Sequence, residues 1–128
     1  MLLSSPWRPV SMPVDEACRY YAIPDHLMRL MPEQITDWQA DSETCRFLIK
    51  GMGHVQLRMS EMKTGESVSY VPLGKMPFPF ALRFMMHESD ASRCEVRVEM
   101  DADLSNPLMA MMAQRPLQNL VEAMASRL

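Results

Sequence analysis

The C-terminal segment, Ser105 to Leu128, constrains the fold most strongly because it reads as one long helix. Ser105 and Asn106 are favourable N-cap residues, Pro107 suits the first helical turn, and no glycine follows. In the second half of the segment the apolar residues recur at spacings of three and four, which is typical of an amphipathic helix. These residues are Leu117, Leu120, Val121, Met124 and Leu128.

The first half of this helix, residues 108–113, has no polar face. The pattern therefore predicts that protein, a partner or a ligand covers it on nearly every side. Pro116 lies between the two halves, and a proline inside a helix removes one backbone hydrogen bond. We therefore expect a bend that separates the two halves.

The middle of the chain alternates apolar and polar residues with the period of two that half-buried strands show. Strands are expected over Ile35–Gln39, Cys45–Ile49, Val55–Met59, Val68–Tyr70, Phe80–Met85 and Cys94–Met100, with a loop from Pro72 to Pro79. One face of each strand is apolar and the other carries charge, so Arg83 and Arg97 are placed on a solvated outer face. The pattern predicts an antiparallel sheet whose inner face is covered by the final helix.

The N-terminal part predicts one strand and two short helices. Residues Leu3 to Met12 alternate weakly and contain Pro6 and Pro9, which favours an edge strand because proline cannot donate to a ladder. A helical pattern begins at Pro13 and is broken by Pro24. A second short helix is expected from Asp25 to Met31.

Length and composition limit the class of protein. The 128 residues predict one domain, residues 1–128, and the net charge of −3 from 13 basic and 16 acidic residues makes nucleic acid an unexpected partner. The three cysteines, Cys18, Cys45 and Cys94, form no CxxC pair, which favours reduced thiols. No segment resembles a signal peptide or a membrane span, so we expect a cytoplasmic protein without membrane insertion.

The order of strand, two short helices, antiparallel strands and long C-terminal helix resembles the helix-grip fold. Further resemblance lies in Gly51 to Arg58, Pro77 to Phe80, Asn106 to Leu108 and Arg115 to Gln118. The chain is similar to the SRPBCC superfamily, which groups START domains, birch-pollen-allergen-like proteins and polyketide cyclases, and especially to its small, uncharacterised bacterial members. The resemblance implies an α+β fold in which a curved sheet wraps around the long helix and leaves an apolar cavity.

The sequence offers few groups for catalysis. His26, His54 and His87 form no HxxxH, HxH or HxxE pattern, so no metal ligand, catalytic residue or cofactor is predicted. Asp101 and Asp103 are interpreted as negative charge near the N-terminus of the final helix. If the protein were a cyclase- or dehydratase-like enzyme, His54 or Tyr70 would be the polar residue available in the cavity.

The remaining candidate site is an apolar lining rich in methionine, of which the chain has 15. Methionine fills irregular cores and also lines adaptable pockets, and both interpretations stay open. The candidate ligand-binding residues are Leu57, Met59, Tyr70, Phe80, Phe84, Val96 and Met100 on the strands, facing Leu108, Met111 and Met112 on the helix. We expect a small hydrophobic ligand. The alternatives are the enzyme and a filled-core protein that forms a homodimer through methionines and aromatic residues such as Trp7 and Trp38.

Overall fold

The computed structural model describes residues 1–74 and 78–128, and it has the α+β fold expected from the sequence. The strands are β1 (Leu2–Ser4), β2 (Arg8–Val10), β3 (Ile35–Ala40), β4 (Thr44–Ile49), β5 (Gly53–Lys63), β6 (Ser67–Pro72), β7 (Phe80–Asp90) and β8 (Arg93–Ala102). The helices are α1 (Val14–Tyr21), the 3₁₀ helix η1 (Pro24–Leu30) and α2 (Pro107–Ala125). The expected loop from Pro72 to Pro79 includes residues 75–77, which lie outside the described part.

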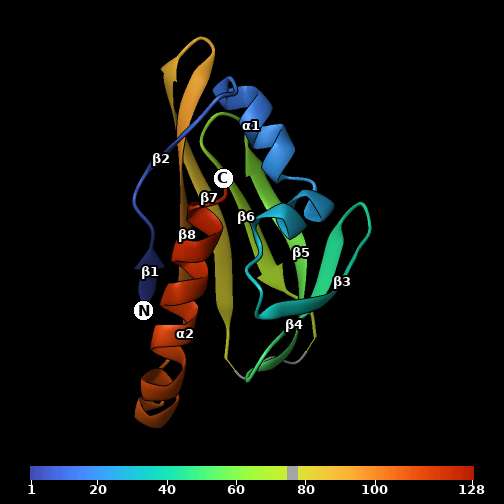
Figure 1. Cartoon of the computed structure of the whole chain (residues 1–128), viewed down its shortest axis with the longest axis vertical. Helices are drawn as coiled ribbons and strands as arrows, with labels where there is room; N and C mark the ends of the chain where they lie inside the picture. The colour runs from blue at the N-terminus through green and yellow to red at the C-terminus, as the bar shows by residue number, and fades with distance from the viewer. Residues whose placement is uncertain (75–77) are drawn as a thin grey trace.

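One antiparallel sheet contains all the strands that the structure describes (Figure 1). Its order is β1-β8-β7-β6-β5-β4-β3, and β2 also pairs with β8. The strands from β3 to β8 follow one another as neighbours because each is joined to the next by a short turn or loop. At the β5–β6 turn Gly65 has φ +79°, a conformation that glycine adopts without strain. The antiparallel sheet predicted from the alternation is confirmed.

The predicted N-terminal edge strand is confirmed, but it is divided into β1 and β2. Both pieces pair with β8, and residues 5–7 between them leave the ladder. Ser5 bridges this interruption, because its N–H donates to the Val98 carbonyl at 2.9 Å and its Oγ accepts from the Val98 N–H at 3.0 Å. Pro6 lacks an N–H and lies in this break, where none is needed.

Helices α1 and η1 cover one part of the sheet, at the upper right of Figure 1. The buried Tyr21 ring of α1 stacks on Phe84 of β7 with ring centroids 5.1 Å apart. The hydroxyl of the buried Tyr70 donates to the Tyr21 carbonyl at 2.6 Å. This part of the inner face is a tightly packed core in which the tyrosine hydroxyl has a backbone partner.

Helix α2 begins at the expected cap and crosses the sheet beside β8 and β1 (Figure 1). The Asn106 side chain accepts hydrogen bonds from the N–H groups of Leu108 and Met109 at 2.9 and 3.3 Å. The helix continues through Pro116 as one element. Its buried residues are Ala113, Leu117, Leu120, Val121, Met124 and Ala125.

The first half of α2 differs from the expectation. Leu108, Met111 and Met112 are 63%, 77% and 70% exposed, so the prediction that they face the sheet is wrong. The lower end of α2 projects past the sheet in Figure 1, and only one side of the helix, marked by the buried Ala113, meets the rest of the chain. A helical run without a polar face has no contrast between polar and apolar sides, so its sequence does not indicate which side is covered.

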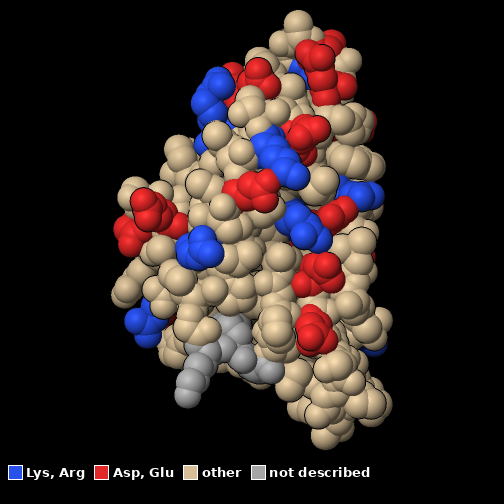
Figure 2. All heavy atoms as spheres, turned by 180° about the vertical axis from the view of Figure 1, so that it is seen from behind, with Lys and Arg blue, Asp and Glu red and all other residues tan. Residues whose placement is uncertain are grey.

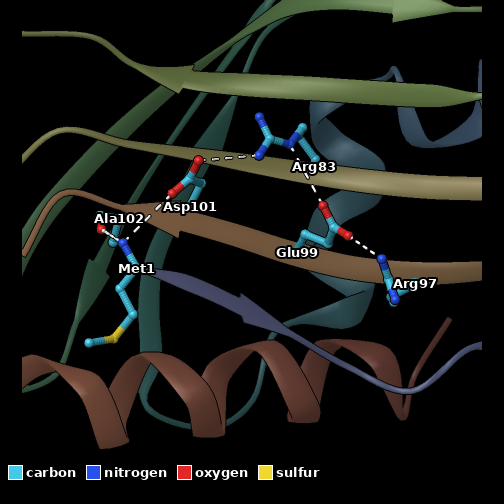
Figure 3. Close-up of polar contacts among 6 residues, drawn as sticks. All are labelled: Met1, Arg83, Arg97, Glu99, Asp101 and Ala102. Atoms are coloured by element: carbon cyan, nitrogen blue, oxygen red, sulfur yellow. Dashed lines mark hydrogen bonds and ion pairs between the residues drawn. The ribbon is translucent and has the colours of Figure 1, made fainter.

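The outer face of the sheet carries charges of both signs, seen from behind in Figure 2. Arg83 and Arg97 lie there, as expected, but they join an ion-pair network rather than standing free in solvent (Figure 3). Glu99, which is only 6% exposed, lies between them, and Arg83 also pairs with Asp101 at 3.5 Å. The Arg97 guanidinium stacks over the Trp7 ring, 4.8 Å from its centroid.

Candidate functional site

An apolar cavity of about 30 Å³, which we call the inner cavity, lies between the sheet and the C-terminal half of α2. The sheet contributes Phe47 and Ile49 from β4, His54, Val55 and Leu57 from β5, Phe80 and Leu82 from β7, and Met100 from β8. Met31, Met52, Phe78, Leu117, Leu120 and Met124 complete the lining. The volume has room for about two water molecules, and a lining this apolar favours an empty cavity over a hydrated one.

The turn between β4 and β5 places two of the lining residues. Gly51 and Gly53 have φ +87° and +110°, and both values belong to the left-handed region that glycine favours. The turn directs Met52 against the core, and β5 begins at Gly53, followed by His54, which pairs opposite Leu48. His54 borders the inner cavity but is exposed, and it alternates along β5 with the buried Val55 and Leu57, which places its imidazole toward the outer face of the sheet.

A second and more open space adjoins the inner cavity at the N-terminal half of α2. We call it the outer groove. Its volume is about 300 Å³, and it is lined by Gly51, Met52, Phe78, Asn106, Leu108, Met109, Met112 and Ala113. Met52 and Phe78 line both spaces, so their side chains lie between the inner cavity and the outer groove. The two spaces form one apolar path interrupted by two side chains.

The structure brings together half of the residues proposed from the sequence. Leu57, Phe80 and Met100 line the inner cavity, and Leu108 and Met112 line the outer groove. Met59, Tyr70, Phe84, Val96 and Met111 line neither space. Tyr70, Phe84 and Val96 are buried in the core, Met59 is half-buried against it, and Met111 is exposed. The four strand residues do not meet the others because strand parity identifies a face of a sheet but not a position along it.

Sequence reasoning missed several lining residues, among them Phe47, Met31, Leu117, Leu120 and Met124. A signal for the helical ones was present, since Leu117, Leu120 and Met124 belong to the amphipathic stripe of the last helix. The lack of a polar face in the first half of the helix points instead to Leu108, Met111 and Met112. No local pattern distinguishes Phe47 or Met31 from other core residues.

The electrostatics of the site are weak. Among the residues that the structure describes, His54 is the titratable residue that borders the inner cavity. Burial raises the pKa of the nearby Cys45 thiol to about 12, assisted by the negative charge of Asp41, so the thiol is protonated at neutral pH. Burial likewise raises the pKa of Tyr70 well above its ordinary value, and its hydroxyl remains a hydrogen-bond donor. The arrangement suits an apolar ligand better than an ionic one.

Two searches of the described residues add to this picture. No group of three or more histidine, cysteine, aspartate or glutamate side chains gathers where a metal ion could be held, within residues 1–74 and 78–128. In the same residues no helix has the length and hydropathy to cross a membrane.

Comparison of the whole structure with solved structures identifies proteins of similar fold. It is similar to norcoclaurine synthase from Thalictrum flavum, with a TM-score of 0.70, 9% identity and coverage of 98% of this chain and 84% of that one. A START superfamily protein from Mycobacterium smegmatis matches with a TM-score of 0.66, 12% identity and coverage of 98% and 95%. The di-domain ARO/CYC protein BexL of the BE-7585A biosynthetic pathway matches with a TM-score of 0.64 and 14% identity, over 99% of this chain but 46% of BexL.

No family model and no curated protein matches the chain by sequence. The structural likeness nevertheless confirms the fold expected from the sequence, because it extends over nearly the whole chain in each comparison. The chain has the helix-grip fold of START-like proteins, with a long C-terminal helix against an antiparallel sheet. Many chemistries use this type of fold, so the function has to be argued from the site.

Proposed function

We propose that the protein binds a small hydrophobic ligand between the sheet and α2, in the inner cavity and the outer groove together. The observation that carries the proposal is a mainly apolar lining that extends from the buried Leu120 to the exposed Met112, with the side chains of Met52 and Phe78 between the two spaces. A norcoclaurine synthase of similar fold has been determined in complex with dopamine and hydroxybenzaldehyde, two small aromatic molecules.

The size of the inner cavity sets a condition on this binding. Pockets that bury a small molecule usually measure roughly 300–1,000 Å³. The inner cavity has about 30 Å³ and the outer groove about 300 Å³, so a ligand must displace side chains to reach both. Methionine side chains have three rotatable bonds and repack readily, and Met31, Met52, Met100 and Met124 all line the inner cavity.

The test is a fluorescence titration with N-phenyl-1-naphthylamine, a neutral apolar probe. Met52→Lys puts a charge between the two spaces and should weaken binding of the probe about tenfold or more, since an ammonium group is costly to bury beside an apolar ligand. Met62→Lys is the matched control, because Met62 is exposed at the far end of β5. Equal affinities of the wild type and both variants would contradict the proposal.

A cyclase- or dehydratase-like enzyme is a second candidate, because one titratable residue, His54, borders the inner cavity. The residue borders the inner cavity, but its exposed imidazole would have to turn inward to exchange a proton with a bound molecule. Tyr70 is the weaker choice, because its hydroxyl is buried and bonded to the Tyr21 carbonyl. If a substrate is found, His54→Ala should lower kcat while the probe still binds, whereas an unchanged kcat would remove this residue from the reaction.

A homodimer is a third candidate, and the exposure of Leu108, Met111 and Met112 favours it. The tryptophans are less suited, because Trp7 packs on His87 and Arg97 while Trp38 stacks on Phe47. Analytical ultracentrifugation over a wide concentration range tests it. A dimer that Met111→Lys dissociates would support association through α2, and a monomer at every concentration would contradict it.

The expected bacterial origin and cytoplasmic location remain predictions.

A further inference from the structure

A third space lies away from the inner cavity and the outer groove and shares no lining residue with them. It is a groove of about 640 Å³ between the segment Pro9–Met12, the α1–η1 region and the end of the chain at Arg127 and Leu128. Its volume is within the usual range of small-molecule sites. We call it the arginine groove, because Arg29 and Arg127 both line it.

The charged side chains that line this groove are both basic. No aspartate or glutamate is among the residues that line it, and neither arginine forms an ion pair with any carboxylate that the structure describes. Arg83, Arg93 and Arg97 are paired with acidic side chains on the sheet, whereas Arg115, like the two arginines of the groove, has no ion pair among the described residues. Two positive charges in one concave surface therefore lack a neutralising side chain among the described residues.

Both guanidinium groups are held in place but retain free donors. Arg29 Nη1 donates to the Tyr20 hydroxyl at 2.9 Å, and the Tyr20 ring is itself stacked on His26 with centroids 4.1 Å apart. Arg127 Nη1 donates to the Ala123 carbonyl at 3.0 Å. A guanidinium has five N–H donors, and each of these contacts uses one nitrogen. The remaining donors can form the paired hydrogen bonds with which arginine binds carboxylates.

The rest of the groove has both polar and apolar surface, and Ser11 and Tyr20 contribute to the polar part. Val10, Met12, Leu30 and Leu128 line it together with the Tyr21 side of α1. A ligand that matches both features has an anionic head and a hydrophobic body. A fully hydrophilic anion would leave the apolar wall uncovered, and a neutral hydrocarbon would leave both arginines unpaired.

We propose that the arginine groove binds an amphiphilic carboxylate, with Arg29 and Arg127 holding the carboxylate group and the apolar wall holding the hydrocarbon chain. This site is separate from the proposed site beneath α2, and neither depends on the other. Binding there would cover the junction of β2, η1 and the end of α2, three parts of the chain that are distant in sequence.

The test is isothermal titration calorimetry of the whole protein with decanoate below its micelle concentration. Wild-type protein should bind decanoate, and the double variant Arg29→Gln/Arg127→Gln should bind it about tenfold or more weakly, since charge-assisted hydrogen bonds are lost. Arg115→Gln is the matched control, because Arg115 is an exposed arginine of α2 outside the groove. It should leave the affinity unchanged.

Two further titrations separate this site from the one beneath α2. Decanol has the same chain without the carboxylate, so the double arginine variant should not change its affinity. Met52→Lys should weaken the neutral probe but not decanoate. Failure of the wild type to bind decanoate, or equal affinities of the wild type and the double variant, would overturn the proposal. If Met52→Lys lost decanoate binding and the double variant kept it, decanoate would be assigned to the inner cavity instead.

Discussion

The two halves of α2 have similar apolar content but different environments. In the C-terminal half, residues 117–125, Leu117, Leu120, Val121 and Met124 are at most 4% exposed and face the sheet. In the N-terminal half, residues 107–115, Leu108, Met111 and Met112 are at least 63% exposed. The C-terminal half also has polar residues on its other side, and the N-terminal half up to Ala113 has none. The contrast teaches that apolar content alone does not report burial, and that a polar face is what orients a helix.

The two halves of α2 also have different roles. The C-terminal half contributes to the free energy of folding, since burying a leucine or methionine side chain is worth about 1.5–3 kcal/mol. The N-terminal half leaves much of that apolar area in water, where it is available to a ligand or a partner. The lower end of the molecule in Figure 2, where this half of α2 projects, shows no charged side chains on that face.

The largest expected effect on stability comes from an acidic residue placed in the C-terminal half of α2, compared with one placed in the N-terminal half. Val121→Asp buries an unpaired carboxylate at a fully buried position, and it should lower the free energy of unfolding by more than about 4 kcal/mol or abolish folding. Met111→Asp, at an exposed position, should change it by about 0.5 kcal/mol or less. Urea unfolding followed by circular dichroism measures both. Comparable losses in the two variants would show that the N-terminal half is also packed in solution.

A smaller effect is expected from Tyr70→Phe, which tests the same contrast on the sheet. The region under α1 is packed and hydrogen-bonded, whereas the region under α2 contains the inner cavity. Removing the hydroxyl leaves the Tyr21 carbonyl without its partner and should cost about 1–3 kcal/mol of stability. Affinity for the neutral probe should be unchanged, because Tyr70 does not line the inner cavity. Tyr20→Phe, which removes a hydroxyl at the surface, is the control and should cost less.

The smallest and most local effect is expected from Asn106→Ala. The side chain caps two N–H groups of α2, and losing an N-cap typically costs about 1 kcal/mol. Because the N-terminal half has few buried contacts, the loss should appear as faster hydrogen exchange in residues 108–112 and not in residues 117–125. Ser105→Ala is the matched control, since the Ser105 side chain makes no hydrogen bond that the structure describes. Equal protection in the two variants would mean that Asn106 is not the cap in solution.

The alternation of residues carried most of the information about the fold. Val96 and Val98 on β8, and Leu82 and Phe84 on β7, are buried on one face while Arg83 and Arg97 lie on the other, as the period of two predicts. The edge position of Leu3–Met12 followed from its prolines, and the start of α2 followed from Asn106 and Pro107. These are local rules, because they depend on backbone geometry over a few residues.

The candidate site was predicted less well. Leu57, Phe80 and Met100 were placed at the inner cavity correctly, whereas Tyr70 and Phe84 share their face but lie under α1. The ion-pair network around Glu99 was also missed. Arg83 of β7 and Glu99 of β8 are distant in sequence and become neighbours only when the two strands pair. The position of the cavity depends on which end of each strand a helix covers, and the network depends on the register between β7 and β8.

The sequence by itself determined the antiparallel sheet, the two short helices and the long C-terminal helix, since each has a characteristic period and characteristic end residues. Only the tertiary structure decided which half of that helix is buried and where the sheet remains uncovered. It also brought Arg29 and Arg127 to one groove from distant parts of the chain. The physical reason is that backbone preferences act between near neighbours, whereas burial and the position of a cavity depend on how whole elements pack.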